Sequence, residues 1–173
     1  MISSAELTRL WRKHAAALLL LARGRCGAAI GQAEDCVQEA FIRLAAQVTI
    51  PEDSIAWLAR VVRNAAIDAA RTQRRRTQHE MAAVESRPTL FEAADIAADH
   101  TQSEEVQLAL QTLDEETREV VIAHLWNNMT FRQIAEAFGM SPATAHRRYD
   151  TGINCLRASL RQSSVTLGEK DST

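Results

Sequence analysis

The sequence predicts an all-α protein, with two small helical domains joined by an acidic linker. Aromatic residues make up only 5% of the 173 residues and alanine is frequent, which favours helix over strand. Charge is unevenly spread: residues 1–76 carry twelve Lys/Arg against seven Asp/Glu, residues 77–105 one against seven, and residues 106–173 seven against eight. A basic block, an acidic strip and a near-neutral block indicate two domains with a linker between them.

We place the first domain at residues 1–77 and expect three helices in it, at 3–23, 32–47 and 53–77. Ser3 or Ser4 can cap the first of these helices. The glycine-rich run GRCGAAIG separates the first helix from the second, and Pro51 marks the boundary after the second.

The linker is placed at 78–104, where periodicity is weak and acidic residues dominate. The second domain, 105–161, is predicted to be a helix-turn-helix four-helix domain. Its helices are expected at about 104–113, 114–127, 130–138 and 142–160. The remaining segment, 162–173, is polar and is expected to be a disordered tail.

The helix-turn-helix prediction rests on the stretch FRQIAEAFGMSPATAHRRY, residues 131–149. Ala135 is small enough for two helices to cross closely, and Gly139 suits a turn that needs a positive φ. Ser141 is a good N-cap, and Pro142 suits the first turn of the following helix. This pattern is typical of a DNA-binding motif whose second helix enters the major groove.

The second helix of this motif has an apolar inner face and a polar outer face. Arg147 points most directly away from the inner face, and Arg148 lies on a flank. Thr130 and Arg132, at the start of the first motif helix, could reach the DNA backbone. The surface is only modestly basic and Asp150 would repel phosphate, so this domain alone should bind DNA weakly.

Helix 32–47 carries two stripes of different character. One stripe is apolar and is expected in the core: Val37, Ala40, Phe41 and Leu44. The opposite stripe has spacings of three and four and consists of Asp35, Gln38, Glu39 and Ile42. An acidic stripe that contains an apolar residue suits a protein partner with a basic groove, although a plain solvated face fits the spacing almost as well.

Helix 53–77 carries six arginines against one acid over residues 60–76. An arc of about 120° opposite the core face contains six polar residues and one isoleucine: Arg60, Arg63, Asn64, Ile67, Arg71, Arg74 and Arg75. A one-sided basic cluster in a chain of net charge −2 favours nucleic-acid binding over a solvated helix face.

Taken in order along the chain, these segments resemble a bacterial RNA polymerase sigma factor of the extracytoplasmic-function (ECF) type. AEDCVQEAFIRL is similar to the polymerase-binding helix of that family, and WLARVVRNAAIDAARTQRRR is similar to its −10 recognition helix. LDEETREVVIAHLWNNMTFRQIAEAFGMSPATAHRRY resembles its −35 domain. The resemblance covers nearly the whole chain.

The resemblance implies a partner for each surface. Core RNA polymerase would be bound by Asp35, Gln38, Glu39, Phe41 and Ile42. The −10 element would be bound by Arg60, Arg63, Asn64, Arg71, Arg74, Arg75 and Arg76. The −35 element would be contacted by Thr130, Arg132, Ser141, Ala143, Thr144, His146, Arg147 and Arg148. It also implies an anti-sigma factor as a further partner.

Other classes of function find little support in the sequence. The three cysteines are scattered, and the histidines do not stand at ligand spacings, so we expect no metal site and no cofactor. No nucleophile–base pair or phosphate loop indicates an enzyme. The apolar run AAALLLLA is too short to cross a bilayer, and we expect a cytoplasmic protein without membrane insertion. The remaining alternative is a stand-alone helix-turn-helix regulator.

Overall fold

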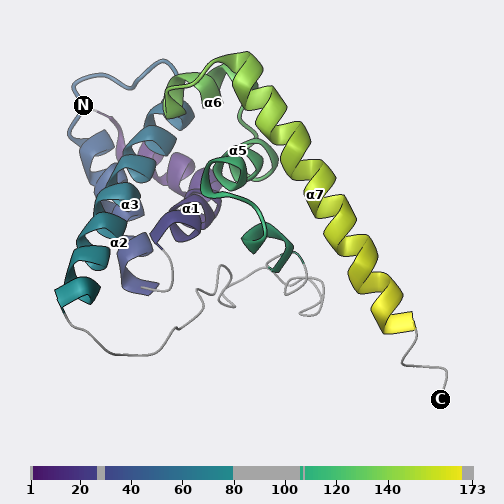
Figure 1. Ribbon diagram of the computed structural model, residues 1–173. Coiled ribbons are helices and arrows are strands. Elements are labelled where there is room, and N and C mark those ends of the chain that lie inside the picture. The colour runs from purple at the N-terminus through teal and green to yellow at the C-terminus, as the bar shows by residue number, and fades with distance from the viewer. Residues whose placement is uncertain (1, 27–29, 80–105, 107, 169–173) are drawn as a thin grey trace.

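The computed structural model describes residues 2–26, 30–79, 106 and 108–168, and these segments consist only of helices and short connections (Figure 1). The helices are α1 (Ser4–Cys26), α2 (Ile30–Ala45), α3 (Ser54–His79), α5 (Glu115–Leu125), α6 (Phe131–Phe138) and α7 (Pro142–Gly168). Residues 108–111 form a further helical turn ahead of α5. The all-α prediction is confirmed.

Helices α1, α3 and α7 end later than predicted, and α1 does so by three residues, at Cys26. Helix α7 ends at Gly168 rather than near 160, so residues 162–168 are helical and the expectation of a disordered tail is wrong for them. This stretch contains no proline and its only glycine is terminal, and each residue added to a formed helix gains a backbone hydrogen bond. Helix α3 likewise continues through His79 into the predicted linker. The rest of that linker and residues 169–173 lie outside the described residues.

Helices α1, α2 and α3 pack against one another and form the N-terminal unit. Their apolar faces meet around Leu18 and Leu21 of α1, Leu44 of α2, and Leu58 and Val62 of α3. None of these side chains is more than 1% exposed. Burial of each one contributes about 1.5–3 kcal/mol, so this cluster determines how the three helices are arranged.

Helices α5, α6 and α7 form the C-terminal unit around Ile122, Met129 and Ile134. The contact between α7 and α5 is close at Gly152, where a Cβ atom would lie 2.5 Å from Cγ2 of Val121. A glycine is therefore needed at this position because any side chain would displace the neighbouring helix.

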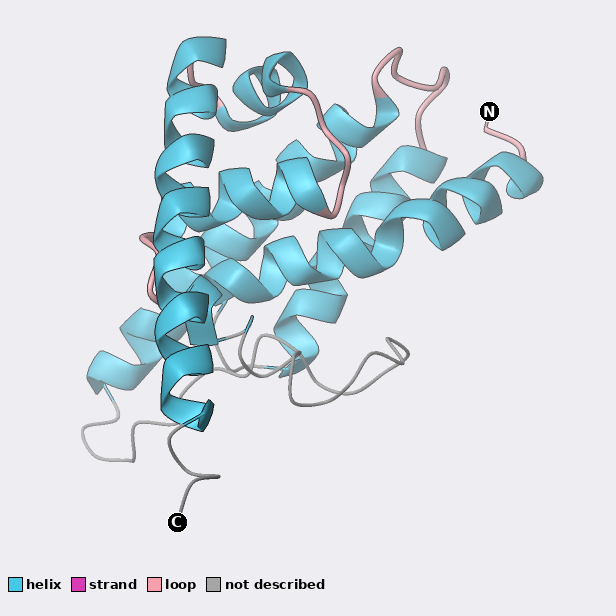
Figure 2. Cartoon of the chain, turned by 90° about the vertical axis from the view of Figure 1, so that its right-hand side faces the viewer, coloured by secondary structure: helices cyan, strands magenta, loops and turns pink. Residues whose placement is uncertain are grey.

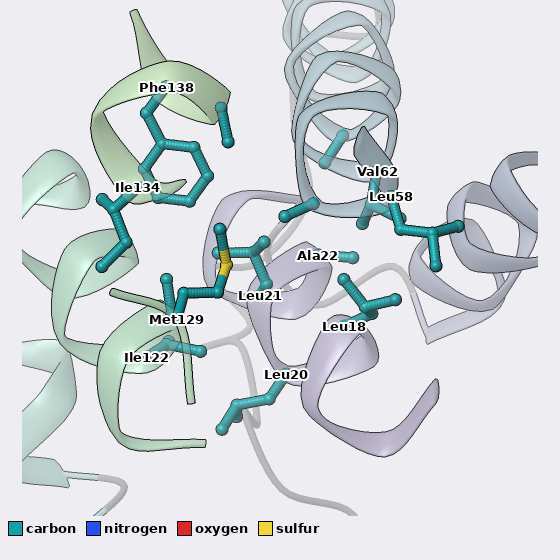
Figure 3. Close-up of a cluster of buried hydrophobic side chains, with 14 of the residues drawn as sticks. Leu18, Leu20, Leu21, Ala22, Leu58, Val62, Ile122, Met129, Ile134 and Phe138 are labelled. Carbon is teal, nitrogen blue, oxygen red and sulfur yellow. The ribbon is translucent and has the colours of Figure 1, made fainter. Parts of the chain in front are cut away.

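The two units share one continuous hydrophobic cluster, which the sequence did not predict. Helix α1 packs on α5, and α3 packs on α6. Figure 3 shows Leu20 and Leu21 of α1 and Val62 of α3 in the same cluster as Met129 and Phe138 of the C-terminal unit. The described residues thus form a closed arrangement in which the units touch directly.

Helix α7 lies along the outside of this arrangement, and Figure 1 shows its C-terminal half extending away from the other helices. Figure 2 views the molecule from the side of α7, which crosses the helices behind it at a steep angle. Its N-terminal half contacts α5 and α6 through Ala145, Gly152 and Leu156, all of which are buried. The first turns of α7 are thereby fixed relative to α6.

Candidate nucleic-acid interface

The predicted acidic stripe of α2 lies on the surface. Its members are all exposed, and we call them the docking stripe: Asp35, Gln38, Glu39 and Ile42. Ile42 leaves 63% of its surface exposed, which is unusual for an isoleucine on an amphipathic helix. Glu39 accepts a hydrogen bond from Nε of Arg43 at 2.7 Å, so part of its charge is offset by its own helix.

Phe41 was expected to contact core RNA polymerase, and its burial corrects this expectation. It is only 4% exposed, and its ring packs edge-on against Trp11 of α1 at 4.8 Å between ring centroids. Its periodicity already placed it with the core residues of α2. Phe41 can support the docking stripe from beneath but does not face a partner.

The arginines of α3 form a basic surface, which we call the basic arc: Arg60, Arg63, Asn64, Arg71, Arg74, Arg75 and Arg76. All of these except Arg63 are exposed. Asp68, the one acid within this stretch, lies 3.8 Å from Arg71 and is itself exposed. The arc runs along a helix of 26 residues, which is about 39 Å long at 1.5 Å per residue.

Arg63 is the exception, and its burial corrects the expectation that it faces DNA in this arrangement. Its Nε donates a hydrogen bond to Oε2 of Glu119 at 2.8 Å, and its guanidinium lies 5.1 Å from the ring centroid of Phe138. Its side chain is only 14% exposed. The C-terminal unit therefore covers this part of the basic arc.

Two glutamates of α5 bind three arginines of the N-terminal unit. Glu115 accepts hydrogen bonds from Arg25 at 2.7 Å and from Arg74 at 3.4 Å. Glu119 is 2% exposed, and its second oxygen lies 3.5 Å from Nε of Arg25. That oxygen, Oε1, finds no hydrogen-bond partner within the described part of the chain.

Two further polar contacts cross between the units. Arg118 donates to the backbone oxygen of Gly24 at 3.0 Å, and Asn127 donates to the backbone oxygen of Ala17 at 3.2 Å. Sequence reasoning missed all of these contacts. The available signal was Glu119, an acid that lies one helical turn before Ile122 and directly precedes the apolar run Val120–Ala123 of α5.

The turn of the helix-turn-helix has the predicted geometry. Gly139 adopts φ 71° and ψ 40°, the left-handed conformation that ends α6. Thr130 caps the start of α6 in a reciprocal pair with Gln133, so its hydroxyl is already engaged in a hydrogen bond. Ser141 accepts a hydrogen bond from the backbone N–H of Thr144 at 3.1 Å and caps α7.

The residues on the outer face of α7 differ in their exposure and in their contacts. Ala143 and Arg147 are exposed, and Thr144 is half-buried. His146 lies between the ring of Phe131, 4.9 Å away by centroids, and the carboxylate of Asp150, 3.1 Å from its Nδ1. The carboxylate of Asp150, which we expected to repel phosphate, thus contacts a side chain of its own helix.

Arg148 lies on the flank of α7 and is occupied by α5. It forms an ion pair with Glu116 and lies 3.8 Å from Asp114, and its side chain is 29% exposed. Because the guanidinium already joins the two helices, a DNA contact by Arg148 would require this ion pair to break. Arg147 is left as the exposed arginine of the recognition face among the described residues.

Arg132 of α6 and Arg60 of α3 line one cavity of about 530 Å³ between the two units. The other lining residues come from the α2–α3 connection, α3 and α6: Pro51, Glu52, Asp53, Trp57, Gln133 and Glu136. Basic and acidic side chains face this space in similar numbers. In the closed arrangement a predicted −10 residue and a predicted −35 residue therefore face the same cavity.

The described residues contain neither a metal cluster nor a membrane-spanning helix. No group of three His, Cys, Asp or Glu side chains there could bind a metal ion. No helix in those segments has the length and apolar character of a membrane span. Cys36 is buried and Cys155 is exposed, and neither forms a disulfide within the described residues.

Comparison with known proteins finds family models that match both helical units. Residues 10–76 match the family model described as Sigma-70 region 2, and residues 103–150 match the model described as Sigma-70, region 4. The chain is 36% identical over 149 residues to the probable ECF RNA polymerase sigma factor SigI of Mycobacterium tuberculosis, which covers 79% of this chain. The chain spans about half the length of that relative, 51%.

Solved structures show the same fold at low sequence identity. The sigma factor RpoE of Bartonella quintana, in complex with the anti-sigma factor NepR, aligns with a TM-score of 0.69 at 20% identity and covers 89% of this chain and 95% of its own. CnrH, in complex with the cytosolic domain of CnrY, aligns with a TM-score of 0.60 at 21% identity and covers 92% and 90%. The two regions occur here in the order of the family, and the chain belongs to the sigma-70 family of RNA polymerase sigma factors, in its ECF type.

Proposed function

We propose that this protein binds core RNA polymerase, directs it to promoters and helps to open the −10 element. The observation that carries the proposal is that one small unit bears both an acidic, partly apolar stripe on α2 and a basic arc on α3. A stripe of this kind suits a basic protein groove, and a basic arc suits nucleic acid. A factor that joins a polymerase to DNA needs both surfaces.

The basic arc would bind the −10 region in two ways. The exposed arginines at its C-terminal end, Arg74, Arg75 and Arg76, would contact phosphates. Asn64 is exposed one helical turn after Arg60, and its amide can pair with the edge of an unstacked base. Release of a base from the duplex costs a few kcal/mol, and prepared contacts offset this cost.

The helix-turn-helix would place the first turns of α7 in the major groove at the −35 element. Arg147 would contact base edges or phosphates, while Ser141, Ala143 and Thr144 would lie closest to the groove at the start of the helix. Arg132 of α6 is exposed and would contact the backbone. The low positive charge of this surface is compatible with a domain that polymerase brings to its site.

The protein would supply recognition and no catalytic residue, since polymerase performs the chemistry. We expect it to act in the cytoplasm, where polymerase and DNA are found, and to need no cofactor. The two solved relatives were captured with an anti-sigma factor and with the cytosolic domain of CnrY. We propose that an anti-sigma factor is a partner of this chain as well.

A pull-down with purified core polymerase tests the proposal. The double variant Asp35→Arg/Glu39→Arg reverses the charge of the docking stripe and is expected to abolish co-purification. Glu6→Arg is the control for charge reversal, because Glu6 is a partly exposed acid on α1 outside the stripe. Unchanged binding of the double variant, or failure of the unmodified protein to bind polymerase, would reject the proposed function.

A further inference from the structure

One histidine on the outer face of α7 is held by a carboxylate of the same helix. Nδ1 of His146 lies 3.1 Å from Oδ2 of Asp150, one helical turn further along α7. Both side chains are more than half exposed, at 59% and 55%. His146 directly precedes Arg147, the arginine that we propose for the −35 contact. The pair therefore belongs to the surface that would meet the DNA groove.

The ring of His146 is also held from the side of α6. The ring of Phe131 lies 4.9 Å from it between centroids, at an interplanar angle of 74°. Phe131 is itself stacked on His124 of α5, with ring centroids 4.5 Å apart. His124 in turn donates from Nδ1 to the backbone oxygen of Met129 at 2.7 Å, because a carbonyl oxygen can only accept. These contacts connect the core of the C-terminal unit to the imidazole of His146 and restrict how it can turn.

The partner of Nδ1 decides which ring nitrogen of His146 carries a hydrogen. An ionised carboxylate accepts hydrogen bonds and donates none, so the contact with Asp150 needs a hydrogen on Nδ1. In a neutral imidazole the other nitrogen, Nε2, then carries no hydrogen and is an acceptor. Within the described residues no group forms a hydrogen bond with Nε2 of His146. An exposed acceptor is thus left for a ligand.

The major groove offers hydrogens to such an acceptor on two of the four bases. Adenine presents its N6 amino group there and cytosine its N4 amino group, whereas guanine and thymine present acceptors. Every base pair contains one of these amino groups, so an acceptor reads which strand carries it. Arg147 has the opposite chemistry, because a guanidinium only donates and pairs best with guanine.

We propose that Asp150 is a positioning residue that holds His146 as a hydrogen-bond acceptor, and that His146 reads an exocyclic amino group in the −35 element. This proposal rests on the proposed function, because it assumes that α7 enters the major groove of that element. One position should therefore prefer adenine or cytosine over guanine or thymine on the contacted strand. A protonated imidazole would donate instead and would favour guanine.

Three variants of the full chain separate this role from a general effect of charge. His146→Ala removes the acceptor. Asp150→Asn keeps the shape of the side chain, but its amide can either accept from Nδ1 or donate to it, so it no longer fixes the position of the hydrogen. Glu136→Gln is the matched control, because Glu136 is an exposed acid of the same helix-turn-helix and forms no ion pair with a described residue.

The first measurement records the tautomer of His146 in the free protein by long-range ¹H–¹⁵N NMR of the imidazole rings. The signal that is missing from His146→Ala identifies this residue among the five histidines of the chain. The unmodified protein and Glu136→Gln should carry the hydrogen on Nδ1 and none on Nε2, whereas Asp150→Asn should contain both tautomers. A hydrogen on Nε2 in the unmodified protein, or an unchanged His146 signal in Asp150→Asn, would overturn the proposal.

The second measurement is transcription by core polymerase with each protein, on templates that carry each of the four bases at each −35 position. The unmodified protein and Glu136→Gln should favour adenine and cytosine at one position by about two- to tenfold, the range expected for a single hydrogen bond. This preference should disappear in His146→Ala and weaken in Asp150→Asn, while the preferences at the other positions stay unchanged. Loss of the Asp150 charge alone would change transcription from all templates alike, since phosphates are common to every sequence.

Two results of this second measurement contradict the proposal. One is a preference for guanine at the position that responds to His146→Ala, and the other is a preference that Asp150→Asn leaves intact. If no protein supports transcription, the proposed function fails together with the base contact. The NMR spectra of the free protein still decide whether Asp150 sets the tautomer of His146.

Discussion

Arg148 is joined to Glu116 of α5, whereas its neighbour Arg147 faces solvent from the same helix. Two adjacent arginines of α7 therefore have different surroundings. The flank of α7 that carries Arg148 is fixed against the start of α5. The face that carries Arg147 is free to enter a DNA groove.

This difference predicts unequal effects on promoter selection. Arg147→Ala should reduce discrimination at one position of the −35 element by about 1–3 kcal/mol, because a bidentate base contact is lost. Arg148→Ala should leave sequence preference unchanged and lower the free energy of unfolding by about 0.5 kcal/mol, as expected for a partly exposed ion pair. Transcription from a set of single −35 substitutions measures the first effect, and urea denaturation measures the second. Uniform loss over all −35 sequences in Arg147→Ala would make it a phosphate contact instead.

Because α7 packs closely against α5 at Gly152, we expect a substitution there to lower the stability of the protein strongly. Gly152→Ala should destabilise the protein by about 1–3 kcal/mol, because the new Cβ would lie 2.5 Å from Val121 and 2.9 Å from Thr117 side-chain atoms. Gly31→Ala is the control, because no atom lies within 4 Å of a Cβ at that helical position. It should be neutral or stabilising by up to about 1 kcal/mol. Equal midpoints of thermal unfolding for the two variants would contradict this packing.

The exposure of Ile42 predicts a specific loss of polymerase binding. Ile42→Ala should weaken binding by about 1–2 kcal/mol, since an apolar residue at the centre of an interface is buried on association. Val48→Ala is a matched control, because Val48 is 83% exposed and follows the end of α2, outside the docking stripe. Titration of labelled protein with core polymerase gives both dissociation constants. A similar change in the two variants would place the interface elsewhere.

The burial of His14 in α1 leads us to expect that the protein loses stability in acid. Burial, followed by the nearby charge of Lys13, lowers the pKa of His14 below its ordinary value of 6.5. As pH falls below 6.5, the imidazole of His14 becomes protonated in the unfolded chain before it does so in the folded chain. The free energy of unfolding is therefore unaffected by His14 above pH 6.5 and decreases as pH falls below it. The free energy of unfolding should decrease between pH 7 and pH 5, and His14→Gln should reduce this decrease. An unchanged pH dependence in the variant would contradict the assignment.

Features that depend on neighbouring residues in the sequence were predicted well. The positive φ of Gly139 and the N-cap at Ser141 follow from the chemistry of a few adjacent residues, and both have the expected geometry. The separation of α2 into a core stripe and a surface stripe follows from helical periodicity in the same way. Periodicity assigned Phe41 to the core and the family resemblance assigned it to polymerase binding, and only the core assignment matches its burial.

The contact between the two units could not be predicted in this way. Arg63 and Glu119 are 56 residues apart, and periodicity along α3 shows which face is basic but not what covers it. Arg148 shows the same limit, since its position on the flank of α7 suited either DNA or the neighbouring α5. In both cases an arginine expected to bind phosphate has a glutamate partner, and charge alone does not distinguish the two.

Transcription by core polymerase on a pool of templates with randomised upstream DNA tests the central claim most directly. Sequencing of the transcribed templates should reveal two enriched blocks, one near −10 and one near −35, and only when both the protein and core polymerase are present. Templates selected with Arg147→Ala should lose preference in the upstream block alone. Absence of any enriched sequence, or the same enrichment by the protein without polymerase, would contradict a role as a promoter-recognition subunit.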